Sequence, residues 1–272
     1  MSRVTLLGSF PSENVDGFIA STARISTDSR QTDVRGLIRY LFRHSHLSPF
    51  EFANFTFEIE APIFVKNHVV RHRSAKFNER SLRYTTYKED FFRPSQHEGA
   101  IRFCLTENQQ EPSRDYSGDN LREIYEKNKK LNNRQSSIVL PNEEVKNDFL
   151  RIEQKIENLF EEYQLLLNKG IAPEVARFCL PLATMTKFRI CFDLRNLLNF
   201  LNLRLDSGAQ KETRDIAEQM YQLIKPLAPE TLSVWEEYEY NALKLTLLKD
   251  NVSISERNEM KLKFDIIDNI SK

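Results

Sequence analysis

The feature that most restricts the fold of this 272-residue chain is the order of its strand-like and helix-like segments. Phe55, Phe57 and Ile59 alternate with polar residues, and residues 185–193 alternate in the same way, a pattern typical of β-strands. The helix-like segments between and after them do not follow the regular strand–helix–strand order of a parallel sheet. The sequence therefore predicts an α+β fold.

Periodicity and helix-ending residues predict the other elements. A short strand is expected at residues 3–7. Helices are expected at residues 14–25, 33–44, 63–72, 148–169, 174–180, 194–205, 210–225 and 230–248. Pro62 suits the first turn of the helix that follows it, and Gly170 suits the end of the helix before it. Residues 104–147 are rich in Asn, Gln, Glu and Lys, and we interpret them as a long, partly disordered surface insertion.

Bulk composition excludes few functions. Lys and Arg together number 39, as do Asp and Glu, so the net charge indicates neither a nucleic acid nor a membrane as partner. The apolar runs are too short to span a bilayer and the N-terminus lacks the signal-peptide pattern, so we expect a cytoplasmic protein. The 3 cysteines lack metal-ligand spacing, and neither a disulfide framework nor a metal site is expected. The 7 glycines form neither a Rossmann fingerprint nor a P-loop.

The densest local charge lies between Lys66 and Tyr84. This segment holds six basic residues and one acid, Glu79, and it also contains His68 and His72. Arginine forms bidentate contacts with phosphate groups, so the segment is a candidate anion site. Two other readings are a solvated basic helix end and a groove for nucleic acid, although the latter favours interleaved aromatic residues and several lysines.

The order of the residues in this segment resembles the signature of the flavin-dependent thymidylate synthases. Arg71, His72 and Arg73 are followed after seven residues by Ser81, then by Arg83. Four further blocks match the family in the same order: ARIS at 23–26, HSHLSPFE at 44–51, EVARFCLP at 174–181 and LRNLLNFLNLRLD at 194–206. The match brackets residues 20–212 and excludes the insertion and the end of the chain.

The resemblance implies a homotetramer with a central antiparallel sheet, several long helices and active sites between subunits. It also implies that FAD, reduced by NADPH, provides the hydride, while 5,10-methylenetetrahydrofolate provides the methylene that methylates dUMP to dTMP. Residues 1–230 would form the catalytic domain, and residues 231–272 a C-terminal helical extension and tail. No metal, nucleic acid or membrane is expected.

The resemblance also assigns roles to individual residues. The expected cofactor-binding residues are Ser26, His46, Ser48, Glu51, Arg71, His72, Arg73, Asn78, Glu79, Arg195 and Asn199. The expected substrate-binding residues are His68, Arg71, Glu79, Arg80, Ser81, Leu82, Arg83, Arg177 and Arg204. Arg71, Arg204 and Ser81 are the expected catalytic residues, and Arg177 would reach the substrate phosphate of a neighbouring subunit. Because Arg195 and Asn199 are four residues apart, they share one face of their helix.

Several of these residues have simpler interpretations. Arg204 could pair with Asp206 at a helix end, and Arg177 could pair with Glu174 three residues earlier. Ser81 could be a nucleophile, but a serine hydroxyl needs a base nearby, so we favour a hydrogen bond from Ser81 to the substrate phosphate.

Four positions depart from the family pattern. His68 replaces a usual Gln, Asp193 a usual Asn, Leu82 a usual Gly, and Gly208 a His that approaches FAD. The change at Gly208 implies weaker retention of FAD. Two alternative functions remain: methylation of UMP instead of dUMP, and a non-catalytic protein that binds nucleotides or nucleic acid.

Overall fold

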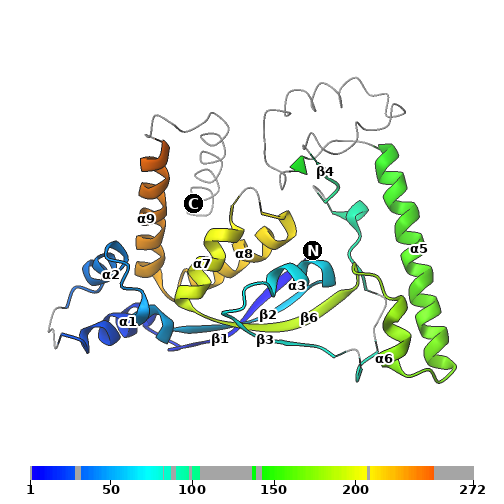
Figure 1. The fold of residues 1–272 in the computed structure, drawn as a ribbon, viewed down its shortest axis with the longest axis horizontal. Coiled ribbons are helices and arrows are strands. Elements are labelled where there is room, and N and C mark those ends of the chain that lie inside the picture. The colour runs from blue at the N-terminus through cyan, green and yellow to red at the C-terminus, as the bar shows by residue number, and fades with distance from the viewer. Residues whose placement is uncertain are drawn as a thin grey trace. The chain divides into compact units, whose positions relative to one another are not determined.

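The structure is a computed structural model that describes residues 2–27, 32–81, 83–86, 90–97, 100–104, 137–138, 143–206 and 209–247. Its main sheet has four strands in the order β1 (Arg3–Phe10), β2 (Asn54–Pro62), β6 (Met185–Asp193) and β3 (Lys76–Glu79). Strands β1 and β2 pair antiparallel, from Arg3 opposite Glu60 to Phe10 opposite Asn54. A second antiparallel pair joins β4 (Phe103–Cys104) to β5 (Ser137–Ile138). The predicted α+β class, with an antiparallel sheet and several helices (Figure 1), is confirmed.

The alternation of side chains in β2 and β6 gives the sheet one apolar face. Phe55, Phe57 and Ile59 are fully buried, as the sequence pattern predicts for a strand with one face on the core. In β6, Phe188 and Ile190 are buried in the same alternating manner. These side chains provide the surface on which the helices of the core pack.

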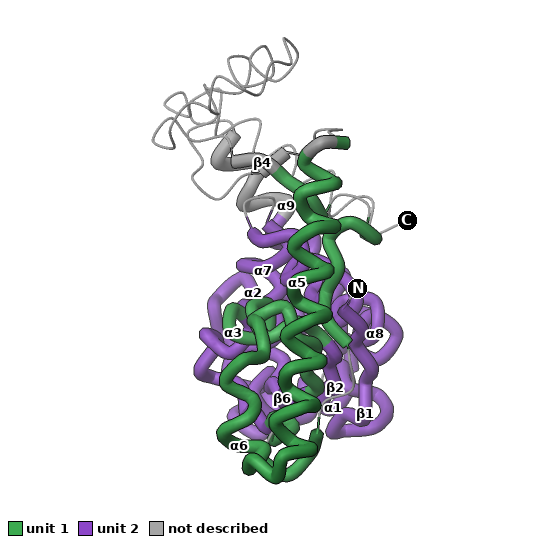
Figure 2. Tube along the Cα trace, turned by 90° about the vertical axis from the view of Figure 1, so that its right-hand side faces the viewer, with its two compact units in different colours: residues 1, 61–68, 79–187 green, residues 2–60, 69–78, 188–272 purple. Residues whose placement is uncertain are grey.

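The chain divides into two compact units, which Figure 2 shows in different colours. Unit 1 comprises residues 61–68 and 79–187, and unit 2 comprises residues 2–60, 69–78 and 188–272. The basic segment that begins at Lys66 is therefore shared between the units, with Arg71, His72 and Arg73 in unit 2 and Arg83 in unit 1. Each unit is described separately below.

Unit 2 contains the helices α1 (Val15–Arg24), α2 (Val34–Arg43), η1 (Ser48–Phe52), α7 (Leu194–Arg204), α8 (Lys211–Ile224) and α9 (Pro229–Leu247). Helix α2 packs against α1 and α9, while α7 packs against α8 and η1. Three helices begin at side chains that accept a hydrogen bond from a backbone N–H in the first turn: Asn14 for α1, Asp33 for α2 and Asp193 for α7. The predicted helices at 14–25, 33–44, 194–205 and 210–225 are thus confirmed.

Helix α9 is attached to the rest of unit 2 by a buried carboxylate. Asp16, which is 6% exposed, accepts hydrogen bonds from the backbone N–H of Glu230 (2.8 Å) and of Thr231 (3.0 Å) and from the Thr231 hydroxyl (2.5 Å). Two exposed ion pairs, Arg35–Glu230 (3.1 Å) and Arg39–Glu237 (2.9 Å), add to this attachment. Helix α9 therefore has a fixed position against α1 and α2.

Unit 1 contains α3 (Ile63–Val69), η2 (Pro94–Gln96), α5 (Glu143–Asn168), α6 (Pro173–Ala176) and η3 (Arg177–Cys179). Its core is a cluster of Phe91, Phe160, Tyr163 and Ala176. Helix α5 ends in the manner predicted, because Gly170 has a φ of 81° and its N–H bonds the carbonyl of Leu167 at 2.9 Å.

Two helix boundaries differ from the prediction. The helix predicted at 63–72 ends at Val69, the last buried residue of its run, and the polar residues that follow form turns in which the amide of His72 bonds the carbonyl of Val69. The helix predicted to begin at 148 begins five residues earlier, at Glu143, because a run of good helix formers precedes it. Most of the predicted insertion, residues 105–136 and 139–142, lies outside the described residues.

Within the described part of the chain, no helix has both the length and the apolar character needed to cross a membrane. The same residues contain no cluster of three or more His, Cys, Asp or Glu side chains suited to a metal ion.

Candidate functional site

A pocket of about 440 Å³ lies beside α7 in unit 2. Two of the predicted cofactor residues, Arg195 and Asn199, line it, together with Asn202 one turn further along the same face of the helix. The expectation that Arg195 and Asn199 share one face is thereby confirmed. Phe42, from α2, and Ser45, from the loop after it, also line the pocket.

The segment HSHLSPFE, residues 44–51, supplies an ion-pair partner for Arg195. The carboxylate of Glu51, on η1, is ion-paired with the guanidinium of Arg195. This contact brings together two of the sequence blocks that resemble the family. His46 follows α2 in an exposed loop, with its ring centroid 6.1 Å from that of Tyr40. Ser48 is the first residue of η1 and is exposed.

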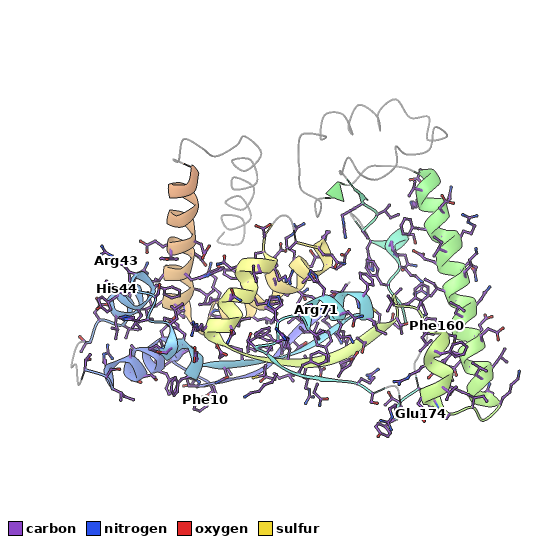
Figure 3. The ribbon with its side chains drawn as sticks, viewed as in Figure 1. Phe10, Arg43, His44, Arg71, Phe160 and Glu174 are labelled. Atoms are coloured by element: carbon purple, nitrogen blue, oxygen red, sulfur yellow. The ribbon has the colours of Figure 1, made fainter. Side chains whose placement is uncertain are left out.

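The Arg71–His72–Arg73 motif meets the C-terminal end of α7. The Nε2 atom of His72 accepts a hydrogen bond of 2.9 Å from Nε of Arg204, although 132 residues separate the two in the sequence. The His72 ring also packs edge-on against Phe200, at 4.7 Å between centroids. Arg71 and Arg73, on either side of this histidine, have exposed side chains (Figure 3 labels Arg71).

Partial burial affects the charge of Arg204. Removal from water lowers the pKa of its guanidinium from the ordinary value, since burial penalises the charged form. Arginine is nevertheless protonated under all physiological conditions, so the group remains a cation. A cation that is partly shielded from water interacts more strongly with a ligand than an exposed one does.

In unit 1, Glu79 is held by two neighbours. One carboxylate oxygen lies 3.0 Å from Nζ of Lys66, and the other accepts a 2.9 Å hydrogen bond from the hydroxyl of Thr186. The side chain of Lys66 is 14% exposed and that of Glu79 is 27% exposed. This carboxylate is therefore fixed in place, while its neighbour Arg80 is exposed and bonds through its amide to the carbonyl of Lys187.

The two predicted phosphate-binding arginines meet at one residue. Nε of Arg83 lies 3.3 Å from the carboxylate of Glu174, and Nε of Arg177 donates a 3.2 Å hydrogen bond to the backbone carbonyl of Glu174. Figure 3 labels Glu174 on α6. The simple interpretation of an Arg177–Glu174 ion pair needs correction, because Arg177 contacts the carbonyl of Glu174 through a local turn and the carboxylate faces Arg83. The cluster carries two positive charges and one negative charge, and so it favours an added anion.

Ser81 makes backbone-directed contacts beside this cluster. Its hydroxyl accepts a 3.3 Å hydrogen bond from the amide of Arg83, and its carbonyl accepts bonds from the amides of Tyr84 and Thr85. These contacts use the amides of Arg83, Tyr84 and Thr85 within the turn, and they fix the position of Ser81. His68 lies half-buried in the last turn of α3. Leu82 lies outside the described residues.

The remaining predicted residues are placed as follows. Ser26, just after α1, and Asn78, in β3, are exposed. Asp193 caps α7, accepting hydrogen bonds from the amide (2.9 Å) and side chain (2.7 Å) of Asn196. Asn and Asp are equally good helix caps, so this departure from the family preserves the start of α7. Gly208 lies outside the described residues.

Sequence reasoning missed the contribution of α9 to the pocket. Trp235, Tyr238 and Glu239 all line it, and Nδ2 of Asn202 donates a 2.7 Å hydrogen bond to the Glu239 carboxylate. The available signal was the spacing 235, 238, 239, which places an aromatic pair and an acid on one helix face. The sequence analysis places these residues in the C-terminal extension, outside the family match.

The residues present fit a flavin nucleotide. Unit 2 offers exposed cationic groups (Arg71, Arg73) for a pyrophosphate or a flavin carbonyl, and a pocket of the size that proteins use for small ligands. The guanidinium of Arg24 adds a second indication, because its buried Nε and Nη2 atoms have no hydrogen-bond partner in the structure. A buried guanidinium with unsatisfied donors is costly, so an anionic group is expected to satisfy it.

Comparisons with known proteins agree with these features. The model of the family described as thymidylate synthase complementing protein matches residues 10–230. The chain is 32% identical to a flavin-dependent thymidylate synthase of Dictyostelium discoideum, over 91% of this chain and 75% of that protein. It is 35% identical to one of Treponema denticola, over 85% of this chain and 79% of that protein.

Solved structures show a similar fold. A UMP/dUMP methylase, PolB, from Streptomyces cacaoi bound with 5-Br UMP superposes with a TM-score of 0.68 at 30% identity, covering 88% of this chain and 95% of that chain. The same methylase bound with 5-Br dUMP gives a TM-score of 0.67 at 31% identity, covering 87% and 95%. These relatives are methyl-transferring enzymes that act on pyrimidine nucleotides, as their names state. The chain belongs to the thymidylate synthase complementing protein family, that of the flavin-dependent thymidylate synthases.

Proposed function

We propose that this chain methylates C5 of dUMP to give dTMP, with 5,10-methylenetetrahydrofolate as carbon donor and NADPH as reductant. The contact between Arg204 and His72 carries this proposal, because it joins the two sequence blocks to which the family resemblance assigns the nucleotide and the flavin. FAD supplies the reducing equivalents when it is bound. The reaction releases tetrahydrofolate, and we propose that it takes place in the cytoplasm.

The role of Arg204 follows from its environment. The hydrogen bond to His72 uses Nε, so the histidine fixes the orientation of the Arg204 guanidinium. A guanidinium aimed at a uracil carbonyl stabilises negative charge on the ring and so raises the electron density at C5. His72 acts as a positioning residue for Arg204, and Arg71, which is exposed, is the second cation for the same carbonyl edge.

The phosphate of the nucleotide is assigned to the Arg83–Glu174–Arg177 cluster together with Ser81. Two arginines supply charge-assisted hydrogen bonds, and the hydroxyl of Ser81, held in its turn, supplies a further donor. Glu79, fixed by Lys66 and Thr186, and the neighbouring Arg80 are assigned to the nucleotide as well. We propose that the enzyme is a homotetramer in which Arg177 reaches a site shared with a second copy.

Cysteine chemistry is not part of the proposed mechanism. Burial raises the pKa of the Cys179 thiol, which disfavours the nucleophilic thiolate, and its Sγ donates to the carbonyl of Ala176 at 3.2 Å. Cys191 is half-buried in β6. A variant with Cys104, Cys179 and Cys191 all replaced by serine should keep its turnover within about tenfold once corrected for FAD content. A loss above about a thousandfold with FAD still bound, some 4 kcal/mol in the barrier, would show that a thiolate is required.

The decisive experiment has two parts. The purified protein should be yellow and should convert dUMP to dTMP with methylenetetrahydrofolate and NADPH. A colourless protein that takes up no FAD on reconstitution would instead favour a non-catalytic nucleotide-binding or nucleic-acid-binding relative. A second candidate, methylation of UMP, deserves a parallel assay because the methylase from Streptomyces cacaoi is described as a UMP/dUMP methylase.

Mixed tetramers test the proposed sharing of sites. Tetramers assembled from an inactive Arg177→Ala chain and an inactive Arg204→Ala chain should regain part of the activity, because one mixed site then has both native residues. Sites formed within a single chain would give no recovery.

A further inference from the structure

We propose that Lys66 is a positioning residue for the reaction: its ammonium group holds the Glu79 carboxylate in the orientation in which it accepts a hydrogen bond from the nucleotide. This inference rests on the proposed function, which assigns Glu79 to the nucleotide. The family resemblance assigns no role to Lys66. Both residues belong to unit 1, so the pair is described within one compact part of the chain.

The side chain of Lys66 is largely removed from water. It belongs to α3, where the preceding residue, Val65, is fully buried, and 14% of the lysine side chain is exposed. Lysines are seldom this shielded unless they are paired, because an unpaired charge out of water is costly. The carboxylate of Glu79, 3.0 Å from Nζ, is the partner that the structure provides.

The backbone and the side chain of Glu79 are both fixed. Glu79 ends β3, the neighbour of β6 in the sheet, and the amide of Arg80 donates a 2.9 Å hydrogen bond to the carbonyl of Lys187. Thr186 of β6, which is 4% exposed, donates its hydroxyl to Oε1 of Glu79 at 2.9 Å. Lys66 donates to Oε2, so each carboxylate oxygen has one donor.

The carboxylate can accept more than these two hydrogen bonds. Its two oxygens offer about four lone-pair positions and no donor, and Lys66 and Thr186 use one position on each oxygen. The side chain of Glu79 is 27% exposed, so a ligand can reach it. A group bound there must donate an N–H or an O–H. In dUMP these donors are the N3–H of the uracil ring and the 3′-hydroxyl of the sugar.

The direction of the Glu79 side chain depends on which cation it pairs with. Glu79 is the one acid among the six basic residues between Lys66 and Tyr84. Its adjacent residue, Arg80, is exposed, yet the carboxylate pairs with Lys66, 13 positions earlier. Removal of Lys66 would therefore release the carboxylate to turn toward Arg80 or solvent, where it no longer meets the nucleotide.

The test measures the dissociation constant of dUMP on the full-length, FAD-loaded protein by titration calorimetry, together with kcat and KM. Lys66→Met keeps the length of the side chain without its charge and should weaken dUMP binding by about tenfold. KM should rise by a similar factor while kcat changes by less than about threefold, because uniform binding is lost. Lys66→Arg, which keeps the cation, should stay within about twofold of the native protein. If the methionine variant does not fold, Lys66→Gln should weaken binding by about threefold or more.

A double-mutant cycle and two substrate analogues test whether Lys66 acts through Glu79. In the Glu79→Gln background, Lys66→Met should cause no further loss of dUMP affinity, because no carboxylate remains for the lysine to hold. The analogues 3-methyl-dUMP and 2′,3′-dideoxy-UMP each lack one of the two donors. For the analogue that lacks the donor bonded to Glu79, the native protein and Lys66→Met should bind with equal affinity.

The matched control is Arg93→Met, which removes the cation of another partly buried ion pair in unit 1, Arg93–Glu157 at 3.1 Å. It should leave dUMP affinity unchanged, and thermal unfolding monitors the fold of every variant. A loss that persists in the Glu79→Gln background, or that is equal for dUMP and both analogues, would overturn the inference. So would a fall in kcat at unchanged KM, which partial unfolding produces.

The remaining outcomes separate this inference from the proposed function. Native dUMP affinity in Lys66→Met would overturn the role of Lys66 and leave the proposed function intact. A native protein that takes up FAD but neither binds nor methylates dUMP would contradict the proposed function, and the role of Lys66 with it.

Discussion

In unit 1, the side chains of Arg83 and Glu174 are 55% and 54% exposed. In unit 2, the pocket beside α7 is lined by Trp235, Phe42 and Phe50, which are at most 7% exposed. The Arg83–Glu174 region can select a ligand only by its charge, because its side chains are exposed to solvent and do not define a fixed shape. The second selects by shape and hydrogen bonding, because its walls are fixed by packing. A charged cluster of the first kind suits a substrate that enters and leaves at each turnover, and a preformed pocket suits a ligand that stays bound.

The largest expected effect is a loss of stability when Asp16, which holds the start of α9, is replaced. Asp16→Ala should destabilise the protein by about 3 kcal/mol, because it removes a buried charged acceptor and leaves two amides at the start of α9 without a partner. For a chain of this size the melting temperature should fall by about 6–12 °C.

The matched control for this prediction is Asp33→Ala, which removes the exposed cap of α2 and should cost only about 1 kcal/mol. FAD affinity should fall in Asp16→Ala and stay nearly unchanged in Asp33→Ala, because Asp16 is buried at the start of α9, whereas Asp33 is an exposed cap at the end of α2 remote from Phe42. Equal effects of the two variants on stability and on FAD would remove the distinction between a supported pocket and an ordinary helix end.

Substitutions in the Arg83–Glu174–Arg177 cluster should change the affinity for the substrate and should not change the stability of the protein. Arg83→Ala should weaken dUMP binding by roughly 10- to 150-fold, since one charge-assisted contact contributes about 1.5–3 kcal/mol. The flavin absorbance and the melting temperature should stay nearly unchanged, because the side chain is exposed. If Arg83→Ala instead lost FAD and kept dUMP, the roles assigned to the two regions would be reversed.

Much of this arrangement could be read from the sequence, because local signals specify it. Asn14, Asp33 and Gly170 mark helix ends by their own backbone and side-chain preferences, and those three ends were predicted to within one or two residues. The alternation of β2 and β6 specified the buried face of the sheet in the same way. The family signature added the order of the functional residues, but their individual roles stay predictions.

The remainder depends on contacts between distant parts of the sequence. The Arg204–His72 hydrogen bond joins residues 132 positions apart, and the cap that Asp16 provides to Thr231 spans 215. No local sequence pattern predicts such long-range contacts. The early end of α3 has a different cause, because the polar residues after Val69 form local turns in place of further helix. The pocket wall on α9 was missed because its acid and aromatic residues read as an ordinary amphipathic helix.

Salt should change the ligand affinities of the two regions to different extents, and by less than the substitutions do. Raising NaCl from about 0.05 to 0.5 M shortens the Debye length several-fold and screens exposed charges most strongly. The dissociation constant of dUMP should rise by about tenfold, and that of FAD by less than about threefold. Isothermal titration at several salt concentrations measures both slopes. Parallel slopes would indicate that FAD binding also depends mainly on exposed charges, contrary to binding in a pocket whose walls are fixed by packing.

The smallest expected effect is a gain in dUMP affinity. The Glu174 carboxylate lies 3.3 Å from Nε of Arg83, so it competes with any phosphate for that guanidinium. An ion pair this exposed contributes only about 0–1 kcal/mol, and Glu174→Gln should therefore tighten dUMP binding by up to about fivefold. The contact of Arg177 should survive the change, because it is made to the backbone carbonyl of residue 174.

Two further variants decide whether that gain arises from competition. Glu157→Gln removes a comparable carboxylate, paired with Arg93 in the same unit, and should leave dUMP affinity unchanged. In the double variant Arg83→Ala and Glu174→Gln, the gain should disappear, because the guanidinium that the carboxylate competes for is gone. A gain that persists without Arg83 would mean that Glu174 acts through general repulsion of the nucleotide. A loss of affinity in Glu174→Gln alone would mean that the carboxylate holds Arg83 in the orientation that binds phosphate.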